Sequence, residues 1–291
     1  NYRFLEEKDM LVTAKEMLQK AREGKYAIGA FNVENMEMVM AVLAAAEAKN
    51  SPVIMQTTPG TIKYAGVDYY YANVAAAAKR SSVPVVMHLD HGDSFQRAMA
   101  AYRAGYTSIM IDGSKLPFED NIDLTKRVVD ACHPGDVYVE GELGKVGGKE
   151  DDLEGDDDNP YTDPEEAKIF VEKTGVDYLA IGVGTAHGVY KGIPKVNTDL
   201  IATIHDMVEV PLVLHGTSGV PDEQVITAVK NGICKVNYAT DLRIAFTRGA
   251  KEFMAEHPEA FDPKKYSQQG MAEVQKYVEQ KIEVCGSVGK A

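Results

Sequence analysis

Eight short apolar runs, each followed by a segment with helical character, constrain the fold of this chain more than any other feature. Most of the runs are continuously apolar rather than alternating, which is typical of parallel strands that are covered on both faces. The segments between them are rich in Ala or open with Pro and acidic residues, as amphipathic helices do. The runs lie at residues 27–32, 53–57, 85–91, 108–113, 137–144, 178–184, 212–219 and 233–240.

Eight strand–helix units in 291 residues predict a closed (β/α)8 barrel, the TIM barrel of the α/β class. An open, doubly wound sheet is the alternative, but it usually needs fewer strands. We expect an N-terminal helix over residues 10–22, ended by Gly24, that caps the barrel, and a C-terminal helical extension over residues 265–284. No repeat or linker is evident, so residues 1–291 are predicted to form a single catalytic domain.

Charge and cysteine content exclude several classes of partner. The net charge of −13 disfavours binding to nucleic acid or to anionic membranes. No apolar run approaches the length of a membrane span. The three cysteines lie far apart without a C-x-x-C pair, which is typical of a reduced intracellular protein. We therefore expect a cytoplasmic protein that binds neither nucleic acid nor membranes.

Polar side chains gather where the predicted strands end. The carboxyl ends of all strands of such a barrel meet at one rim, and active sites are built there. Three of the seven histidines fall at this rim: His91, His187 and His215. Imidazole is the commonest zinc ligand, and three protein ligands with an open fourth position mark a catalytic zinc site. The sequence therefore predicts a metal site at the rim.

The strand that carries His91 raises a question of direction. Asp90 and His91 point to opposite faces of a regular strand, so both can serve the site only if the strand loosens there into a loop. His88 lies earlier in the same strand, and we expect it to be packed or to lie behind the metal ligands. The remaining histidines are expected to be structural or surface residues: His133, His205 and His257.

Glycines at the same rim indicate a phosphate site. Gly188, Gly216 and Gly219 follow the sixth and seventh strands, where barrels often bind phosphate through backbone N–H groups and a helix N-terminus. A metal, a carboxylate and a phosphate pocket together indicate chemistry on a phosphorylated hydroxyketone. The Schiff-base route needs a lysine inside the barrel instead. Lys235 lies near the start of its strand, away from the rim, so the metal route is favoured.

The connection at residues 145–166 is out of proportion to the others and strongly acidic. A solvated surface loop explains most of its acidic residues. Long loops that follow barrel strands often close over a substrate, and the pair Gly147-Gly148 favours a mobile lid of this kind.

Five motifs carry a resemblance to a known family: HLDHG (88–92), VEGELGKVGGKEDD (139–152), GTAHGVYKG (184–192), VLHGTSG (213–219) and KVNYAT (235–240). In this order they resemble the class II ketose-bisphosphate aldolases, which include fructose-1,6- and tagatose-1,6-bisphosphate aldolases. The resemblance extends from GAFNVEN (29–35) to the C-terminal helix. It implies a zinc-dependent aldehyde-lyase of glycolytic or related carbohydrate metabolism. Such an enzyme reversibly cleaves a ketose 1,6-bisphosphate to dihydroxyacetone phosphate and glyceraldehyde 3-phosphate.

The resemblance also implies roles for individual residues. His91, His187 and His215 match the Zn²⁺ ligands, and Asp90 matches the catalytic acid/base. Glu142 matches a glutamate close to the metal, and Glu150 matches the mobile-loop glutamate that transfers a proton at the enediolate carbon. The residues expected to bind the substrate are Thr58, Gly188, Gly216, Thr217, Ser218, Asn237, Tyr238, Ala239, Thr240 and Arg243.

Further implications concern other ligands and partners. A monovalent cation, Na⁺ or K⁺, is a family feature near Lys191 and Gly216. Arg243 matches a position that can reach the second phosphate, from a neighbouring subunit in some cases, so we expect a homodimer or homotetramer. Ala239 stands where enzymes that prefer fructose bisphosphate tend to carry Asp or Asn, and it looks more like the tagatose-bisphosphate enzymes.

Three alternatives to this function remain open at the level of sequence. The first is a related zinc-dependent aldolase that acts on another phosphorylated keto sugar or keto acid. The second is a metal-stabilised protein that binds a sugar phosphate without cleaving it, which Asp90 and Glu150 disfavour. The third is a zinc hydrolase, for which the phosphate loops would have no obvious purpose.

Overall fold

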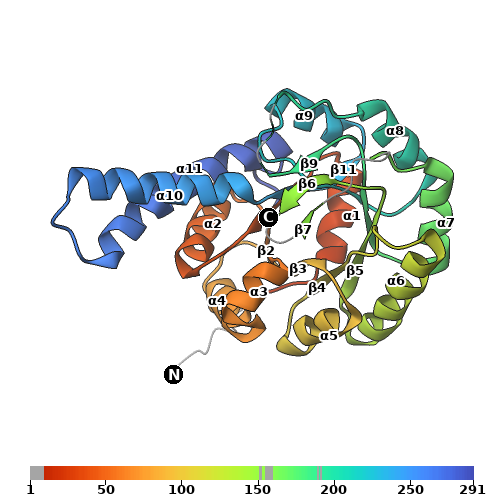
Figure 1. The fold of residues 1–291 in the computed structure, drawn as a ribbon, viewed down its shortest axis with the longest axis horizontal. Coiled ribbons are helices and arrows are strands. Elements are labelled where there is room, and N and C mark those ends of the chain that lie inside the picture. Colours follow the sequence, from red (N-terminus) through yellow and green to blue (C-terminus); the bar gives the residue numbers. More distant parts are fainter. Residues whose placement is uncertain (1–9, 151–152, 155–159, 189, 191) are drawn as a thin grey trace, which may run out of the picture.

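The barrel predicted from the apolar runs is present in a computed structural model of the chain, which describes residues 10–150, 153–154, 160–188, 190 and 192–291. For residues 147–150 and 153–154 it describes the backbone alone. Eight parallel strands close in the order β1-β11-β10-β8-β5-β4-β3-β2, with helices around them (Figure 1). The strands are β1 (Ile28–Asn32), β2 (Val53–Thr57), β3 (Val85–Gly92), β4 (Ser108–Ile111), β5 (Tyr138–Leu143), β8 (Tyr178–Ile181), β10 (Leu212–Leu214) and β11 (Ile233–Tyr238). Each of them lies within one of the eight predicted runs or extends one residue past it, which confirms the (β/α)8 fold.

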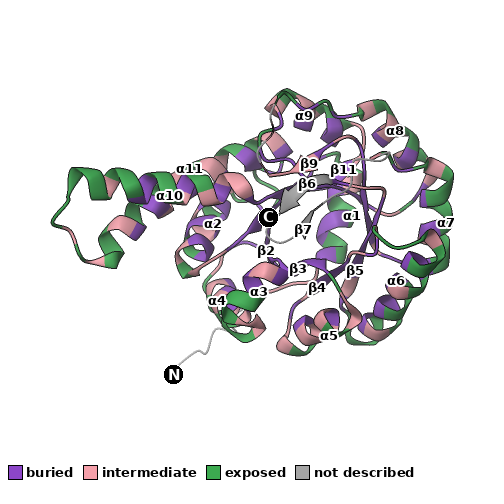
Figure 2. Ribbon diagram, in the orientation of Figure 1, coloured by how far each residue is buried: buried purple, intermediate pink, exposed green. Residues whose placement is uncertain are grey.

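Helices cover the outside of the barrel, so the strands are buried on both faces, as their continuous apolar runs require (Figure 2). Several helices begin at a side chain that accepts a hydrogen bond from a free N–H of the first turn, for example Asn35 before α2 and Asp163 before α7. The outer helices are α2 (Met36–Ala48), α3 (Pro59–Ala65), α4 (Val67–Ala78), α5 (Phe95–Ala104), α6 (Phe118–Cys132), α7 (Pro164–Thr174), α8 (Thr198–Met207) and α9 (Asp222–Lys230); a short 3-10 helix spans His133–Gly135.

The amino-terminal helix α1 (Ala14–Gly24) closes one end of the barrel, as predicted. Its apolar face packs against side chains that point into the barrel near the starts of the strands: Ile28, Ala30, Ile54, Val86, Tyr178, Ala180 and Val213. The helix ends differently from our expectation. Its left-handed cap is Lys25, with φ 52°, whereas Gly24 is the last helical residue.

The carboxyl-terminal helices form the predicted extension. α10 (Thr240–Glu256) and α11 (Pro263–Cys285) pack on each other and project from the barrel as an arm (Figure 1). The carboxyl-terminal half of α11 packs along α2, and its Val274, Val278 and Ile282 are buried. No described helix is both long and apolar enough to cross a membrane.

A small second sheet lies over the rim of the barrel. β6 (Gly147–Glu150) pairs with β7 (Leu153–Glu154) in the predicted lid segment, and on its other side with β9 (Ala186–His187). Gly148 lies opposite His187 in this ladder. The described part of this segment therefore forms short strands, one of which pairs alongside His187.

The barrel interior changes character from the α1 end to the opposite end. Alternate residues of a strand face inward, so His88 and Asp90 share the inner face with Val86 of β3. Glu140 and Glu142 of β5 face inward in the same way. The interior therefore has an apolar layer at α1, a buried charged layer above it, and the candidate site at the carboxyl ends of the strands.

Candidate active site

The three predicted metal ligands lie together at the open end of the barrel. One ring nitrogen each of His91, His187 and His215 lies within 4.8 Å of the other two. The ring centroid of His91 lies 4.7 Å from that of His215 and 4.9 Å from that of His187. His91 comes from β3, His187 from β9, and His215 follows β10 directly.

An irregularity in β3 lets both Asp90 and His91 face this site. His91 has a φ of 48°, in the left-handed region, and the pairing of β3 with β4 shifts register between Leu89 and Gly92. The extra residue turns the His91 side chain inward beside that of Asp90. We expected the strand to loosen into a loop here. The structure instead keeps the strand as far as Gly92 and accommodates His91 in a bulge.

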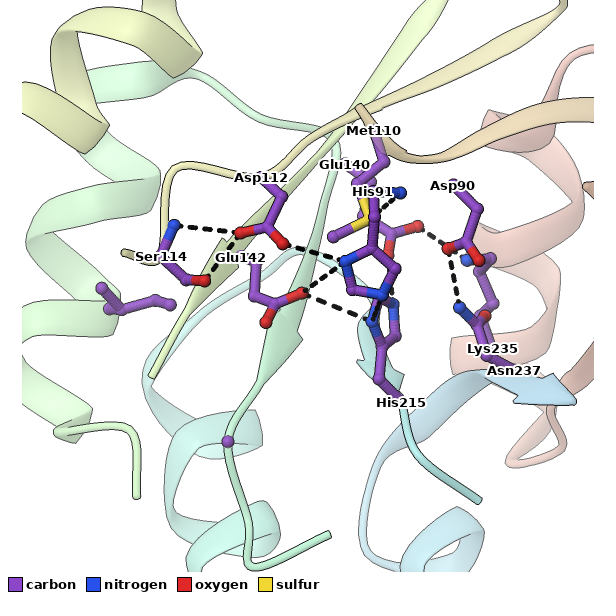
Figure 3. Close-up of polar contacts among 12 residues, drawn as sticks. Asp90, His91, Met110, Asp112, Ser114, Glu140, Glu142, His215, Lys235 and Asn237 are labelled. Atoms are coloured by element: carbon purple, nitrogen blue, oxygen red, sulfur yellow. Dashed lines mark hydrogen bonds and ion pairs between the residues drawn. The ribbon is translucent and has the colours of Figure 1, made fainter. Parts of the chain in front are cut away.

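The outer nitrogens of two histidine rings are hydrogen-bonded to carboxylates. His91 Nδ1 lies 2.9 Å from Asp112 Oδ2, and His215 Nε2 lies 2.8 Å from Glu140 Oε1 (Figure 3). When both nitrogens donate to these carboxylates, His91 Nε2 and His215 Nδ1 present lone pairs to each other at 3.1 Å. Two lone pairs this close repel unless a cation lies beside them. The geometry therefore fits a metal ion.

The pKa values agree with this preference for positive charge. Burial opposes protonation of His215, but hydrogen bonds with Glu140 and Glu142 raise its pKa to about 9. Burial also opposes protonation of His91, and the negative charge of Asp90 with the hydrogen bond to Asp112 raises its pKa well above its usual range. The pKa of His187 is lowered well below its usual range by burial and by the charges of His91 and His215. The two rings that face carboxylates are therefore the ones that favour a positive charge.

Glu142 adds an oxygen to the same cluster. Its Oε2 lies 3.3 Å from His215 Nδ1 and 3.7 Å from His91 Nδ1. Glu142, Asp112 and His91 form a second group with ligand atoms within 4.8 Å of one another. Burial, and then the charge of Asp112, raise the pKa of Glu142. A cation beside His91 would offset both influences by stabilising the ionised form of Glu142.

Asp90 is a carboxylate held in one orientation. Asn32 Nδ2 and Gln56 Nε2 donate to its Oδ2 at 3.0 and 3.2 Å, and Asn237 Nδ2 donates to its Oδ1 at 3.0 Å. Burial alone would raise the pKa of Asp90, but the charges of His91, His215 and Lys235 lower it to about 2. An ionised, oriented carboxylate beside a metal site is suited to accept a proton from a substrate hydroxyl.

A small pocket beside the histidines contains most of the predicted substrate residues. It is lined by His187, Gly188, Gly216, Thr217, Ser218, Asn237, Ala239 and Thr240. Thr240 begins α10, so the free N–H groups of that helix lie at the pocket and suit an anion. Asn237 Oδ1 is buried and has no hydrogen-bond partner among the described residues. The pocket has the donors for a phosphate and one oxygen that can accept from a substrate hydroxyl.

Three other predicted substrate residues lie outside this pocket. The Tyr238 ring points to the opposite face of β11, where it is fully buried and stacks on Phe31 with centroids 5.6 Å apart, because it alternates with Asn237 along the strand. Thr58 caps α3 and hydrogen-bonds with Thr61 at 3.0 Å. Arg243 is paired with a carboxylate, that of Glu34.

Arg243 is bound to a carboxylate that sequence reasoning had not singled out. Its Nε and Nη2 lie 2.8 and 2.7 Å from Glu34 Oε1. The second oxygen of Glu34 accepts a hydrogen bond from Thr61 Oγ1 at 2.9 Å. A string of polar contacts thus connects Thr58, Thr61, Glu34 and Arg243 between α3 and α10. A second phosphate that reached Arg243 would have to compete with Glu34.

Two predicted residues cannot be placed. The Glu150 side chain lies outside the described residues, although its backbone belongs to β6, two residues beyond the partner of His187. Lys191, beside which a monovalent cation is expected, also lies outside the described residues.

A charged layer lies directly below the histidines. Lys235 is fully buried inside the barrel, and its Nζ lies 2.8 Å from Glu140 Oε2 and 3.5 Å from His88 Nε2. His88 is fully buried without joining the metal group, as we expected, and its Nδ1 lies 2.6 Å from Ser108 Oγ. We expected Lys235 to lie away from the rim, and it does, but it contacts the carboxylate that holds His215.

The remaining histidines lie away from the site, as predicted. His133 Nε2 lies 2.8 Å from Asp177, His205 contacts Arg22, and the ring of His257 packs against Phe253.

Several residues that shape the site were not among those predicted: Asn32, Glu34, Gln56, Asp112, Glu140 and Lys235. Asn32 and Asp112 lie at the carboxyl ends of their strands, so the criterion that found the histidines could have found them. The other four residues, Glu34, Gln56, Glu140 and Lys235, could be identified only from side-chain contacts between segments far apart in the sequence.

Comparison with known proteins gives a consistent result. Residues 12–290 match the family described as fructose-bisphosphate aldolase class-II. The YdjI aldolase from Escherichia coli K12 has a similar structure, with a TM-score of 0.86 and 37% sequence identity, covering 97% of this chain and 99% of that one. A putative fructose-1,6-bisphosphate aldolase from Coccidioides immitis has a TM-score of 0.84 and 30% identity, covering 94% and 96%. Fructose-bisphosphate aldolase from Campylobacter jejuni has a TM-score of 0.81 and 26% identity, covering 97% of each chain.

Proposed function

Because the chain belongs to the class II fructose-bisphosphate aldolase family, we propose that it reversibly cleaves a ketose 1,6-bisphosphate with the help of zinc. The products are dihydroxyacetone phosphate and glyceraldehyde 3-phosphate, and the substrate is tagatose or fructose 1,6-bisphosphate. The observation that carries the proposal is the pair of ring nitrogens, His91 Nε2 and His215 Nδ1, which face each other at 3.1 Å. They lie beside Asp90, a carboxylate that three amides hold in place.

Zn²⁺ bound by His91, His187 and His215 would polarise the substrate ketone and stabilise the negative charge that develops on it. Asp90 accepts the proton of the C4 hydroxyl as the bond between C3 and C4 breaks. The electron pair of that bond remains on the C1–C3 fragment as an enediolate, and C4 becomes the aldehyde carbon. Asn32, Gln56 and Asn237 keep Asp90 oriented for this transfer.

The other residues of the rim bind the substrate and complete the proton transfers. The pocket at the N-terminus of α10 binds the phosphate of the dihydroxyacetone-phosphate half through Gly216, Thr217, Ser218 and backbone N–H groups. Glu150 is proposed to return a proton to C3 of the enediolate. A monovalent cation near Gly216 is proposed to assist phosphate binding, as the family resemblance implies.

Two features of the site bear on which sugar is preferred. Ala239 lines the phosphate pocket and leaves no carboxylate there, which supports tagatose bisphosphate. The contact between Glu34 and Arg243 supports an alternative, a zinc-dependent aldolase whose phosphorylated keto sugar or keto acid lacks a second phosphate. In that case the end of the substrate far from the metal lies near Arg243, whose charge is already paired with that of Glu34.

Parallel assays of the zinc-loaded protein test the activity and the sugar together. Tagatose 1,6-bisphosphate, fructose 1,6-bisphosphate and ketose 1-phosphates are offered in turn, with triose phosphate as the readout. We expect cleavage of a ketose phosphate, and Asp90→Asn should lower kcat by about 10²–10⁴-fold while zinc remains bound. His187→Ala should lose both zinc and activity. Full turnover by Asp90→Asn would contradict the role assigned to Asp90, and no triose phosphate from any ketose would contradict the activity.

We propose further that the enzyme is cytoplasmic and forms a homodimer or homotetramer. The arm of α10 and α11 carries exposed apolar side chains, Ile244, Met254 and Phe261, which support an assembly. A monomer in light scattering at micromolar concentration would count against it.

A further inference from the structure

Lys235 is an unusual residue for a barrel interior. Its side chain is fully buried, and a buried ammonium is tolerated only when it is paired and hydrogen-bonded. It is paired with Glu140, which is also fully buried, through a contact of 2.8 Å. Buried ion pairs contribute little net stability, since removal from water opposes their attraction. A contribution to stability is therefore a weak explanation for this pair.

The two oxygens of Glu140 have different partners. Oε2 accepts from Lys235 Nζ, whereas Oε1 lies 2.8 Å from His215 Nε2. Glu140 thus bridges the two side chains, with one oxygen facing each of them. Because the Lys235 ammonium can only donate, Oε2 is its acceptor, and this contact holds the carboxylate with Oε1 toward His215.

The contact with Glu140 decides which nitrogen His215 can offer to a metal. When Glu140 is a carboxylate, His215 Nε2 must carry the proton, and the lone pair lies on Nδ1, toward His91 and Glu142. The other neutral tautomer would point an N–H at the metal position and place a lone pair against Glu140. Such carboxylate–histidine contacts fix the ring orientation of metal ligands in many proteins.

His88 cannot replace Lys235 in this arrangement. Its Nε2 lies 3.4 Å from Glu140 Oε2, and burial followed by the charge of Lys235 lowers its pKa to about 3. His88 is therefore neutral at physiological pH. Among the described residues that contact Glu140, Lys235 is the cationic partner.

We propose that Lys235 is a positioning residue of the zinc site, which acts through Glu140 to hold His215 with Nδ1 toward the metal. The inference rests on the proposed zinc site and extends it to a residue that touches neither metal nor substrate. It also assigns a role to a lysine inside the barrel that differs from Schiff-base formation, because the Lys235 ammonium is committed to a buried carboxylate.

The zinc dissociation constant, measured by competition with a chelator, tests this role in the full-length protein. Lys235→Met and Glu140→Gln should each raise it by about 10–100-fold, the usual effect of losing a partner of a metal-bound histidine. Lys281→Met is the matched control, since Lys281 is a largely buried lysine that pairs at 2.6 Å with Asp222, between α11 and α9, rather than with Glu140. It should leave zinc affinity within about twofold of the parent.

The double variant Glu140→Gln/Lys235→Met separates an action through Glu140 from an independent one. If Lys235 acts through Glu140, the double variant should bind zinc as weakly as Glu140→Gln and no more weakly, because the effects of coupled residues are not additive. Nitrogen-15 NMR of the histidine rings gives a second readout. One zinc-bound histidine should keep a protonated Nε2 in the parent protein, and this signal should be lost in Lys235→Met.

Each outcome bears on a distinct claim. Parent-like zinc affinity in folded Lys235→Met, or additive losses in the double variant, would overturn the role of Lys235 and leave the zinc site standing. A parent protein that binds no zinc would overturn the proposed metal site and this inference with it. If Lys235→Met does not fold, the double variant, which buries no charge, replaces it, and parent-like zinc affinity there would overturn the proposal.

Discussion

At the scale of single residues, the site is defined by which polar atoms are already committed to partners within the chain. Asp90 has both oxygens held by amides, and His215 has one nitrogen held by Glu140. Arg243, expected to reach a second phosphate, is held by Glu34. In the proposed phosphate pocket, Asn237 Oδ1 has no hydrogen-bond partner among the described residues and can accept a hydrogen bond from a ligand.

Removal of the Glu34 charge should favour substrates with a second phosphate. The side chains of Arg243 and Glu34 are 29% and 27% exposed, so their pairing is worth at most about 1 kcal/mol. Glu34→Gln should therefore raise kcat/KM for a ketose bisphosphate, relative to the matching 1-phosphate, by about fivefold. Steady-state kinetics with both substrates measure this ratio.

Glu252→Gln is the control, because it removes an exposed negative charge from α10 near Arg243 without breaking that pair. An unchanged ratio in Glu34→Gln would show that Arg243 does not meet a second phosphate. A similar rise in both variants would indicate a long-range effect of charge alone.

The buried His88 should make the metal-free protein less stable in mild acid. Burial and the charge of Lys235 lower its pKa in the folded state to about 3, whereas its unperturbed pKa is 6.5. The unfolded chain therefore binds the proton first, and stability is lost as pH falls below 6.5. His88→Asn should reduce the stability lost between pH 7 and pH 5 by about 2 kcal/mol.

Urea unfolding in the presence of a chelator, at both pH values, measures the change. His257→Asn, at an exposed position, serves as the control and should keep the pH dependence of the parent. The role of His88 would be refuted by an equal loss of stability in His88→Asn and the parent.

At the scale of elements, the bulge in β3 places His91, a proposed metal ligand, beside Asp90, the proposed base. A regular strand would send His91 outward into the helix layer, as it does Leu89. The bulge depends on Gly92, because a Cβ at that position would lie 2.4 Å from the backbone oxygen of Met110. Strand β3 and its neighbour β4 can approach this closely only with glycine there.

Gly92→Ala should therefore damage both the strand and the site. We expect a loss of about 1–3 kcal/mol in unfolding free energy, since the backbone must move to admit a methyl group. A rise in the zinc dissociation constant of about tenfold or more should accompany it, as His91 shifts. Denaturant unfolding and chelator competition measure the two effects.

Gly192→Ala provides the matched control, because a Cβ there meets no atom within 4 Å. It should change neither quantity. Zinc affinity equal to that of the parent in Gly92→Ala would mean that the bulge does not set the position of His91.

At the scale of the whole molecule, stability and chemistry lie at opposite ends of one barrel. Helix α1 fills the end near the strand starts with apolar side chains, whereas the carboxyl ends present buried charges and imidazoles. His91 Nε2 and His215 Nδ1 face each other at 3.1 Å only in the folded chain, so a metal bound there binds the folded state in preference to the unfolded one. Metal binding should therefore stabilise the entire fold.

Zinc should raise the free energy of unfolding by about 2.7 kcal/mol when its free concentration is 100 times the dissociation constant. Thermal unfolding with and without zinc detects this as a higher Tm. His187→Ala should lose most of the increase, whereas His257→Ala, at an exposed position on the arm, should retain it. An equal zinc-dependent shift in His187→Ala would place the metal elsewhere.

The sequence by itself determined the barrel and the rim. Continuous apolar runs can be satisfied only by strands covered on both faces, and parallel strands bring the residues at their carboxyl ends together wherever the runs lie in the chain. His91, His187, His215 and Asp90 could be assigned to one rim on this ground alone. The same pattern predicted α1, the carboxyl-terminal arm and a packed His88.

Only the tertiary structure decided how the side chains at that rim are directed and paired. Strand alternation sends Tyr238 outward and Asn237 inward, while bulges in β3 and at the start of β11 shift that alternation for His91 and Lys235. The pairs Glu34–Arg243 and Glu140–Lys235 join residues 209 and 95 positions apart. The composition of a strand indicates how far its residues are buried. Contacts between side chains of different elements depend on register, and register is set by the packing of the closed barrel.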